Sequence, residues 1–281
     1  DRETGEPIWP IEELPVPAGD IPGEWYSPTQ PIPTLPAPFD RNTFTEADLI
    51  DWTPEIRALA LEALEGFRLS PNVYSPPSLT DAPDGTRGTL HLPSATGGAN
   101  WEGAAIDPET GILYIPSRTA LGVLSMAKDE NSDVDFSQGF GVRVPRIQGL
   151  DIVKPPYGRI TAIDMNSGDH LWMIANADTP ERTINHPLLE GVDLPRTGVP
   201  TRAGIVLTKT LLFVGEGGGG PGASPILRAI DKQSGEIVAE IETPNTQSGL
   251  PFTYEHDGKQ YLAMFVSGGG RPAELVAYAL P

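Results

Sequence analysis

"AIDPETG" at residues 105–111 recurs as "AIDMNSG" at 162–168 and "AIDKQSG" at 229–235, with a truncated relative, "DRETG", at 1–5. Each copy has an aspartate and, four residues later, a glycine. The aspartate can accept hydrogen bonds from backbone N–H groups of a turn, and the glycine supplies a positive φ. Because apolar residues flank the full copies, each predicts a β-hairpin turn. One such turn is common, but its repetition indicates a repeated β architecture.

Two of the copies place a tryptophan eight residues after the aspartate: Trp9 follows Asp1, and Trp172 follows Asp164. The spacing of the copies suits four-stranded blades with insertions, since such blades without insertions repeat about every 40–50 residues. Glycine and proline, 31 of each, imply many turns and therefore many short strands. We expect an all-β fold in which 1–281 forms a single propeller portion.

Charge and cysteine content exclude several functions. Lys and Arg number 19 against 38 Asp and Glu, a net charge of −19, so the chain lacks the cations that neutralise nucleic-acid phosphates. We therefore expect no nucleic-acid partner. The sequence has no cysteine, which excludes disulfides, thiolate metal sites and cysteine nucleophiles. Its four histidines have no metal-ligand spacing, and we assign them no catalytic role.

An insertion separates the first two copies of the repeat. Residues 15–39 are dense in proline and should run extended over a surface. Thr53 followed by Pro54 is a helix-start signal, and the apolar residues after it share one face. They predict a helix of about four turns that ends near 68–71, with a shorter helix starting at Thr45.

The remaining chain is expected to be sheet with one irregular stretch, 121–156. Its acidic part lacks the spacing of a calcium-binding EF-hand loop and is interpreted as a solvated loop. "GEGGGGPGASP" at 215–225 lacks the Gly-Lys-Ser/Thr of a phosphate-binding loop and is interpreted as a flexible loop between blades. Asp257-Gly258 predicts a two-residue hairpin turn. The predicted strand-rich stretches are 204–215, 224–242, 252–266 and 274–280.

Five longer stretches, distributed along nearly the whole chain, carry a family resemblance. They are "DRETGEPIWPIEELPVP" (1–17), "DIPGEWYSPTQPIPTLPAPFDRNTFTEADLIDWTPE" (20–55), "GTLHLPSATGGANWEGAAIDPETGILYIPS" (88–117), "YGRITAIDMNSGDHLW" (157–172) and "GKQYLAMFVSGGG" (258–270). These stretches resemble the dehydrogenases that depend on pyrroloquinoline quinone (PQQ), and among them the membrane-bound glucose dehydrogenase branch.

The resemblance implies part of an eight-bladed β-propeller, about four blades with tryptophan-docking-type repeats, plus a proline-rich and helical insertion. It divides the chain into the end of a blade (1–14), the insertion (15–92) and the C-terminal blades (93–281). The chain would then supply the C-terminal half of the propeller.

The resemblance also implies which residues contact the cofactor. Asn100 after two glycines is by itself typical of a turn, but in "GGANW" the resemblance implies that its amide reaches the quinone. Trp101, by itself as typical of a core as of a ligand contact, is expected beside it. Thr201 and Arg202 are weaker candidates for cofactor contact. Arg202 is included because a guanidinium can pair a carboxylate bidentately, but a surface arginine fits the pattern equally well.

No catalytic residue or metal ligand is expected in this chain. "DRETG" opens inside a hairpin whose first strand, in the family, precedes it. The family's catalytic aspartate, its lysine, its calcium ligands and the tryptophan that stacks on the quinone lie upstream of Asp1. We therefore expect PQQ and calcium as cofactors, the N-terminal half of the propeller as a partner in the same or a separate chain, and no activity from the isolated chain.

The implied function is oxidation of a sugar or polyol, glucose-like, by hydride transfer to PQQ, with electrons passing to a quinone acceptor. The implied location is the periplasm. The protein is either free there or tethered to the inner membrane through its upstream part. Two alternatives stay open: a non-enzymatic propeller that acts as a scaffold or interaction protein, and a degenerate dehydrogenase that keeps the fold without chemistry.

Overall fold

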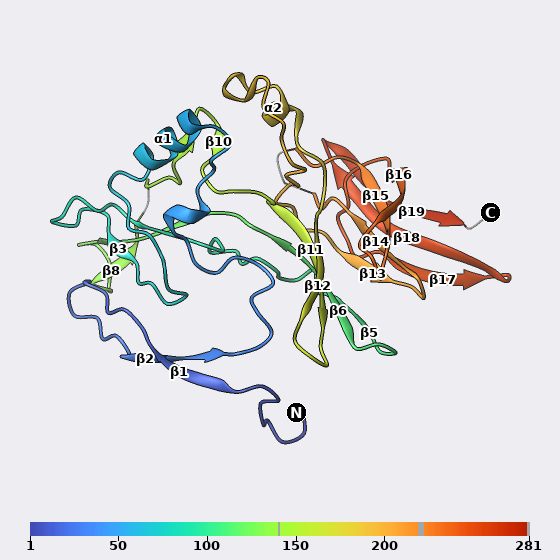
Figure 1. Ribbon diagram of the computed structural model, residues 1–281, viewed down its shortest axis with the longest axis horizontal. Helices are drawn as coiled ribbons and strands as arrows, with labels where there is room; N and C mark the ends of the chain where they lie inside the picture. Colours follow the sequence, from blue (N-terminus) through green and yellow to red (C-terminus); the bar gives the residue numbers. More distant parts are fainter. Residues whose placement is uncertain (140, 219–221, 280–281) are drawn as a thin grey trace. The chain divides into compact units, whose positions relative to one another are not determined.

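The computed structural model describes residues 1–139, 141–218 and 222–279. They form two compact units, of which unit 1 comprises Asp1–Gly98 with Ala120–Lys154, and unit 2 comprises Ala99–Thr119 with Pro155–Pro281. Strands dominate both units (Figure 1), so the expected all-β class with a helical insertion is confirmed. The division at residues 14 and 92 stays a prediction.

Unit 2 contains three antiparallel sheets within the described residues. The first has the order β12-β11-β6-β5, the second β13-β14-β15-β16 and the third β17-β18-β19 (Figure 1). In chain order the elements of unit 2 are β5 (Ala105–Asp107), β6 (Ile112–Arg118), β11 (Gly158–Asp164), β12 (His170–Ala175), α2 (Glu181–Ile184), the 3₁₀ helix η2 (Pro187–Leu189), β13 (Ile205–Leu207), β14 (Leu211–Gly215), β15 (Ile226–Asp231), β16 (Ile237–Glu242), β17 (Phe252–His256), β18 (Lys259–Gly268) and β19 (Arg271–Ala279).

The three full copies of the Asp-x-x-x-Gly segment are hairpin turns, as predicted. Oδ1 of Asp231 accepts hydrogen bonds from the backbone N–H groups of Gln233 and Ser234, both at 2.9 Å. Gly235 has φ +76° and donates its N–H to the Asp231 carbonyl. The copies at 105–111 and 162–168, however, join strands of the same sheet. The number of copies of the turn therefore does not give the number of sheets, because any tight hairpin of a sheet can use the same chemistry.

Trp172 links the first sheet to the second. Its indole Nε1 donates a hydrogen bond to the Lys232 carbonyl at 3.2 Å, and its ring centroid lies 5.8 Å from that of Tyr114. A Cβ added to Gly235 would lie 2.9 Å from the indole. The sequence signal of a tryptophan eight residues after Asp164 thus corresponds to an indole seated on the Asp-Gly turn of the next sheet.

Gly235→Ala should destabilise the protein by about 2 kcal/mol or more, because a left-handed backbone and a crowded indole both oppose the new methyl group. Gly258 provides the matched control: it has φ +75° but nothing within 4 Å of an added Cβ. Urea unfolding of both variants would separate the two effects. Equal losses for Gly235→Ala and Gly258→Ala would show that the indole contact contributes nothing.

A second link between these sheets is the ion pair of Asp107 and Lys232, whose Oδ2 and Nζ lie 2.7 Å apart in a mostly buried setting. The hydrogen bond from Lys232 is the main cause that lowers the pKa of Asp107, with the Thr110 hydroxyl next. A carboxylate with a lowered pKa adds stability above its ordinary pKa and loses that contribution as the pH falls through the lowered value.

Lys232→Met is therefore expected to lower stability at neutral pH, with a difference from the wild type that narrows as the pH falls below about 4 and through the lowered pKa of Asp107. Urea midpoints measured down the acid range would test this. A difference that stays constant from neutral to acid pH would contradict the role of this ion pair.

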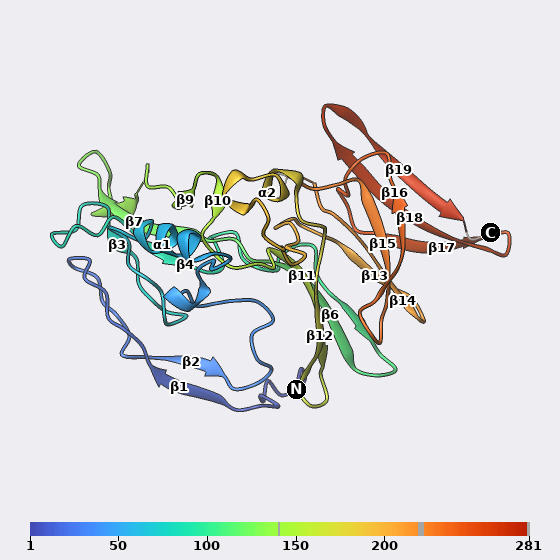
Figure 2. The same ribbon diagram turned by 45° about the horizontal axis from the view of Figure 1, so that its top comes forward.

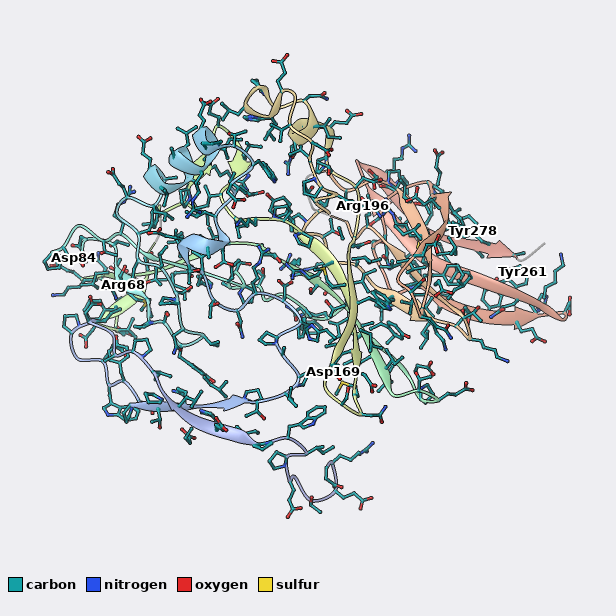
Figure 3. All side chains as sticks on the ribbon, viewed as in Figure 1. Arg68, Asp84, Asp169, Arg196, Tyr261 and Tyr278 are labelled. Atoms are coloured by element: carbon teal, nitrogen blue, oxygen red, sulfur yellow. The ribbon has the colours of Figure 1, made fainter. Side chains whose placement is uncertain are left out.

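The third sheet is apolar on both faces. Leu262, Met264 and Val266 on β18 pack with Leu227 of the second sheet, and Figure 2 shows the two sheets side by side. The opposite face is exposed: Phe252, Tyr254, Phe265 and Leu275 are 40–55% accessible, and the rings of Tyr254 and Tyr261 stack at 4.9 Å. Figure 3 locates Tyr261 and Tyr278 on this sheet. Sheets with two apolar faces are ordinarily packed on both sides.

In unit 1, helix α1 (Pro54–Glu62) begins as predicted, because the Thr53 hydroxyl accepts a hydrogen bond from the Ile56 N–H at 3.1 Å. It ends at Glu62 rather than near 68–71. The chain leaves the helix through successive i→i+3 bonds and then Gly66, whose φ of +74° no α-helix accommodates. The shorter helix expected from Thr45 is the 3₁₀ helix η1 (Glu46–Asp48), closed by a capping box.

The remaining elements of unit 1 are strands. The proline-dense segment forms part of an exposed hairpin, with β1 paired to β2. The stretch 121–156 was expected to be irregular, but it contains strands: β7 pairs with β3, β4 and β8. β3 and β4 lie far from β7 in sequence, so local turn signals gave no indication of those pairings. β8 follows β7 through residues 129–135, which were interpreted as part of a solvated loop. The strands are β1 (Ile11–Pro15), β2 (Thr29–Pro33), β3 (Ser78–Leu79), β4 (Thr89–His91), β7 (Gly122–Lys128), β8 (Phe136–Gln138), β9 (Arg146–Ile147) and β10 (Leu150–Asp151).

Candidate functional site

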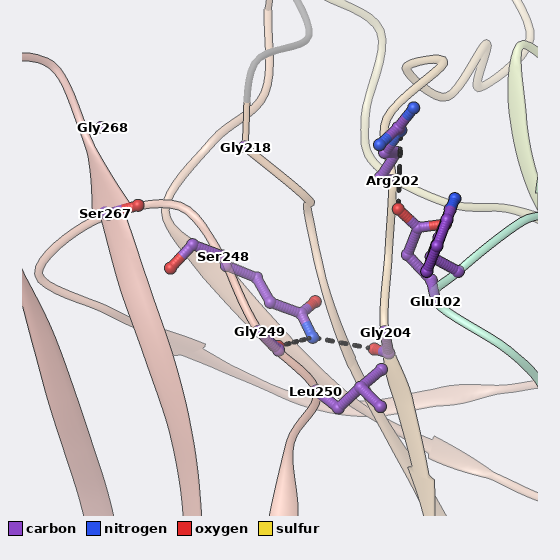
Figure 4. A pocket seen from close by; sticks show the side chains of 11 residues that line it. Glu102, Arg202, Gly204, Gly218, Ser248, Gly249, Leu250, Ser267 and Gly268 are labelled. Atoms are coloured by element: carbon purple, nitrogen blue, oxygen red, sulfur yellow. Dashed lines mark hydrogen bonds and ion pairs between the residues drawn. The ribbon is translucent and has the colours of Figure 1, made fainter. Parts of the chain in front are cut away.

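A pocket of about 460 Å³ opens in unit 2 where several strands of the second and third sheets begin or end (Figure 4). Gly204 directly precedes β13, Gly218 follows β14, and Ser267 and Gly268 close β18. Its volume falls in the range of small-molecule sites. The residues that line it are Trp101, Glu102, Arg202, Gly204, Gly218, Gln247, Ser248, Gly249, Leu250, Ser267 and Gly268.

Arg202 brings a positive charge to this pocket. Its Nε lies 3.5 Å from Oε1 of Glu102, and nearly half of its side chain is accessible to solvent (Figure 4). Burial, and then the neighbouring charge of Arg202, lowers the pKa of Arg118. Two guanidinium groups therefore share this region with the carboxylate of Glu102, which favours binding of an additional anion.

A glycine-rich segment forms one wall. A Cβ on Gly217 would lie 1.1 Å from the Arg202 carbonyl oxygen, so only glycine lets the two backbones approach this closely. Gly218 donates its N–H to the Gln247 carbonyl at 2.6 Å. The interpretation of 215–225 as a flexible loop between blades is wrong in two respects: 215–217 are buried, and the segment joins β14 and β15 of the same sheet. Residues 219–221 lie outside the described residues.

A cluster of ion pairs around the buried Arg228 stabilises the same wall. Arg228 and Glu216 are each only 1% exposed, and Nη1 lies 2.6 Å from Oε1. The other Glu216 oxygen accepts from the Ser224 N–H at 2.5 Å. Glu240 and Asp178 complete the set around the guanidinium at 2.8 and 3.2 Å. Because Glu216 directly precedes Gly217, this cluster fixes the start of the wall.

The four residues predicted to contact a cofactor fall in two groups. Trp101, 87% exposed, and Arg202 both line the pocket. Asn100 is exposed next to Trp101, and Thr201 is buried next to Arg202, but neither is among the lining residues. Within the described residues the Thr201 hydroxyl has no hydrogen-bond partner. Contact of all four with a cofactor stays a prediction.

Sequence reasoning missed Glu102 and the segment 247–250. Glu102 directly follows the Asn-Trp pair, and its acidic side chain gave no motif. Gln247 lies in "PNTQSGLP" at 244–251, whose composition indicates only a turn. Ser267 and Gly268 belong to a stretch that carried the family resemblance, so their signal was present without an assigned role.

Among the residues that the structure describes, no three His, Asp or Glu side chains gather in a way that would hold a metal ion. In the same residues, no helix has the length and hydropathy needed to span a membrane.

The known proteins that resemble this chain in sequence include several dehydrogenases. The glycerol dehydrogenase large subunit of Gluconobacter thailandicus is 31% identical over all of this chain, which spans 41% of that protein. Quinoprotein glucose dehydrogenase A of Acinetobacter calcoaceticus is 28% identical, again over the whole chain and 36% of the relative. The quinate/shikimate dehydrogenase (quinone) of Acinetobacter baylyi is 26% identical, with 36% of its length covered.

The chain thus spans well under half the length of these curated relatives. A family model described as the β-propeller domain of glucose, ethanol and alcohol dehydrogenases, of the PQQ group, matches residues 1–262. Because that match takes in the repeats, the insertion and most of the residues that line the pocket, the chain belongs to the PQQ-dependent dehydrogenase β-propeller family.

Proposed function

We propose that the protein to which this chain belongs is a quinoprotein oxidoreductase that oxidises a sugar or polyol with PQQ as hydride acceptor. The unit 2 pocket would form part of the quinone site. The observation that carries this proposal is Arg202, which lines the pocket together with Trp101 and whose backbone packs against the buried Gly217. Relatives named for glycerol, glucose and quinate support the class of substrate.

The pocket residues fit the chemistry of this cofactor. PQQ is a flat, fused-ring molecule that carries three carboxylates. Arg202 would pair one of them, since a guanidinium offers two parallel N–H donors to a carboxylate. The Trp101 ring offers an apolar surface for the rings, while Gly204 and Gly218 leave space beside them. The hydroxyl of Thr201 lies outside the pocket lining but next to Arg202, and it is buried without a partner in the described part of the chain. It would become a further donor only if cofactor binding shifts this segment.

When bound, PQQ supplies the electron-accepting carbonyl that takes a hydride from a substrate carbon. The residues of this chain would bind and orient the cofactor and exclude water from one side of it. The catalytic aspartate, the lysine and the calcium ligands are assigned to the upstream part of the protein, as is any membrane tether. We place the protein in the periplasm and name a membrane quinone as the electron acceptor.

The exposed face of the third sheet supports a partner half of the propeller. Phe252, Tyr254, Phe265 and Leu275 form an apolar face beyond the inner face that packs on the second sheet. Such a face is a liability in water unless another sheet covers it. We assign the cover to a blade from the upstream part, in the same or a separate chain.

The proposal is tested on the complete protein. PQQ titration, followed by absorbance and fluorescence, should show saturable binding, and a panel of sugars and polyols with an artificial electron acceptor should show PQQ-dependent turnover. A protein that binds no PQQ would be a propeller scaffold instead. Binding without turnover of any sugar or polyol would indicate a degenerate dehydrogenase or a substrate of another class.

A further inference from the structure

Gln247 lies at the floor of the pocket with only 3% of its surface exposed. Its side-chain Nε2 donates to the carbonyl of Gly204 at 3.0 Å and to the carbonyl of Gly249 at 2.9 Å (Figure 4). Its Oε1 accepts from the Gly215 N–H at 3.0 Å. One carboxamide therefore satisfies three backbone groups from three different segments.

All three of these backbone groups belong to glycines, and two of the glycines leave no room for a larger residue. A Cβ on Gly204 would lie 2.8 Å from Nε2, and a Cβ on Gly215 would lie 2.7 Å from Oε1. The carboxamide thus occupies space that side chains would otherwise fill. This fit indicates a built contact rather than a chance loop conformation.

The backbone of Gln247 ties the same segments together. Its N–H donates to the Glu216 carbonyl at 3.1 Å, and its carbonyl accepts from the Gly218 N–H at 2.6 Å. It also forms bridges with Gly217 and with Val266 on β18. Gln247 therefore connects the entry to β13, the end of β14 and the strand β18 that lead to the pocket.

We propose that Gln247 is a positioning residue that holds the walls of the quinone pocket at the spacing a flat cofactor needs. This inference rests on the proposed function of the pocket. Gln247 would act through the backbone of Gly204 and Gly218 rather than by chemistry on the substrate. Only an amide combines an acceptor for the Gly215 N–H with donors for two carbonyls, so the polarity of the group matters as well as its shape.

Gln247→Glu separates these two properties, because it keeps the shape and removes both donors. An ionised carboxylate would place an oxygen against the carbonyls of Gly204 and Gly249, and these groups repel it. Burial and these carbonyls would raise the pKa of the new glutamate. Its protonated form can donate one hydrogen bond. The defect should therefore be largest at neutral or higher pH and should decrease as the pH falls.

The experiment is a PQQ titration of the complete protein between about pH 5 and pH 8, a range that spans the raised pKa of a buried glutamate. For Gln247→Glu we expect affinity about 10–100-fold below wild type at the high end, recovering several-fold at the low end relative to wild type at the same pH. Gln260→Glu, at an exposed position of β18, should match wild type throughout.

Gln247→Met, which has a similar length and no hydrogen-bonding amide, should lose affinity equally at every pH, and thermal unfolding would confirm that it is folded. If Gln247→Glu does not fold at neutral pH, loss of PQQ affinity in folded Gln247→Met would support the positioning role by itself. Wild-type affinity in Gln247→Met, or a Gln247→Glu defect without pH dependence, would overturn the positioning role. Failure of the wild type to bind PQQ would overturn the proposed function itself.

Discussion

Replacing Arg228 with methionine is expected to lower the free energy of unfolding by about 3–5 kcal/mol. The guanidinium is 1% exposed and bonds Glu216, Glu240 and Asp178. Its loss would leave the carboxylate of Glu216, also 1% exposed, without a cation in a site that water does not reach. Urea unfolding of the complete protein, monitored by tryptophan fluorescence, measures the change.

Two further variants show whether buried charge is the cause. Arg228→Met combined with Glu216→Leu removes both charges, and should recover much of the loss because an apolar pair of similar volume often equals a buried ion pair. Arg196→Met removes a partly exposed arginine that pairs with Asp178 at 2.8 Å and should cost less than about 1 kcal/mol. An Arg228→Met variant as stable as Arg196→Met would contradict this account of the cluster.

Arg202→Gln is expected to weaken PQQ binding by the complete protein by about 10–100-fold, since a charge-assisted hydrogen bond to a carboxylate is worth 1.5–3 kcal/mol. Arg202 lines the pocket, and its only ion pair described is with Glu102 at 3.5 Å. Removing that competing carboxylate in Glu102→Gln should raise the affinity. Equilibrium titration at two salt concentrations measures both changes, because ionic contacts weaken as salt rises.

Arg182→Gln is the matched control, since Arg182 is an exposed arginine of unit 2 on α2. Its affinity for PQQ should equal that of the wild type. If Arg202→Gln also binds like the wild type, the guanidinium does not contact the cofactor and the proposed orientation of the pocket is wrong.

Local signals in the sequence predicted local structure well. Thr53-Pro54 placed the start of α1, and Asp257-Gly258 placed the turn between β17 and β18. The tryptophan eight residues after Asp164 was recognised as part of the repeat, but its contact with the second sheet was not predicted, because indole docking depends on a turn far along the chain. Strands such as β7 were missed because their partners are distant in sequence.

The candidate site was predicted only in part for the same reason. Trp101 and Arg202 were predicted because the family resemblance implied cofactor contacts there, and both line the pocket. Gln247 carried no such signal, because its role depends on three glycines that come together only in the fold. Glycines that accommodate a neighbouring side chain cannot be distinguished in sequence from glycines that form turns.

The account depends most on the claim that the unit 2 pocket belongs to the quinone site. A crystal structure of the complete protein with PQQ tests it directly. We predict electron density for a flat tricarboxylate against Trp101 and the glycine wall at Gly218, with one carboxylate paired to the Arg202 guanidinium. Density for the quinone elsewhere, with this pocket filled only by water or by side chains, would contradict the claim.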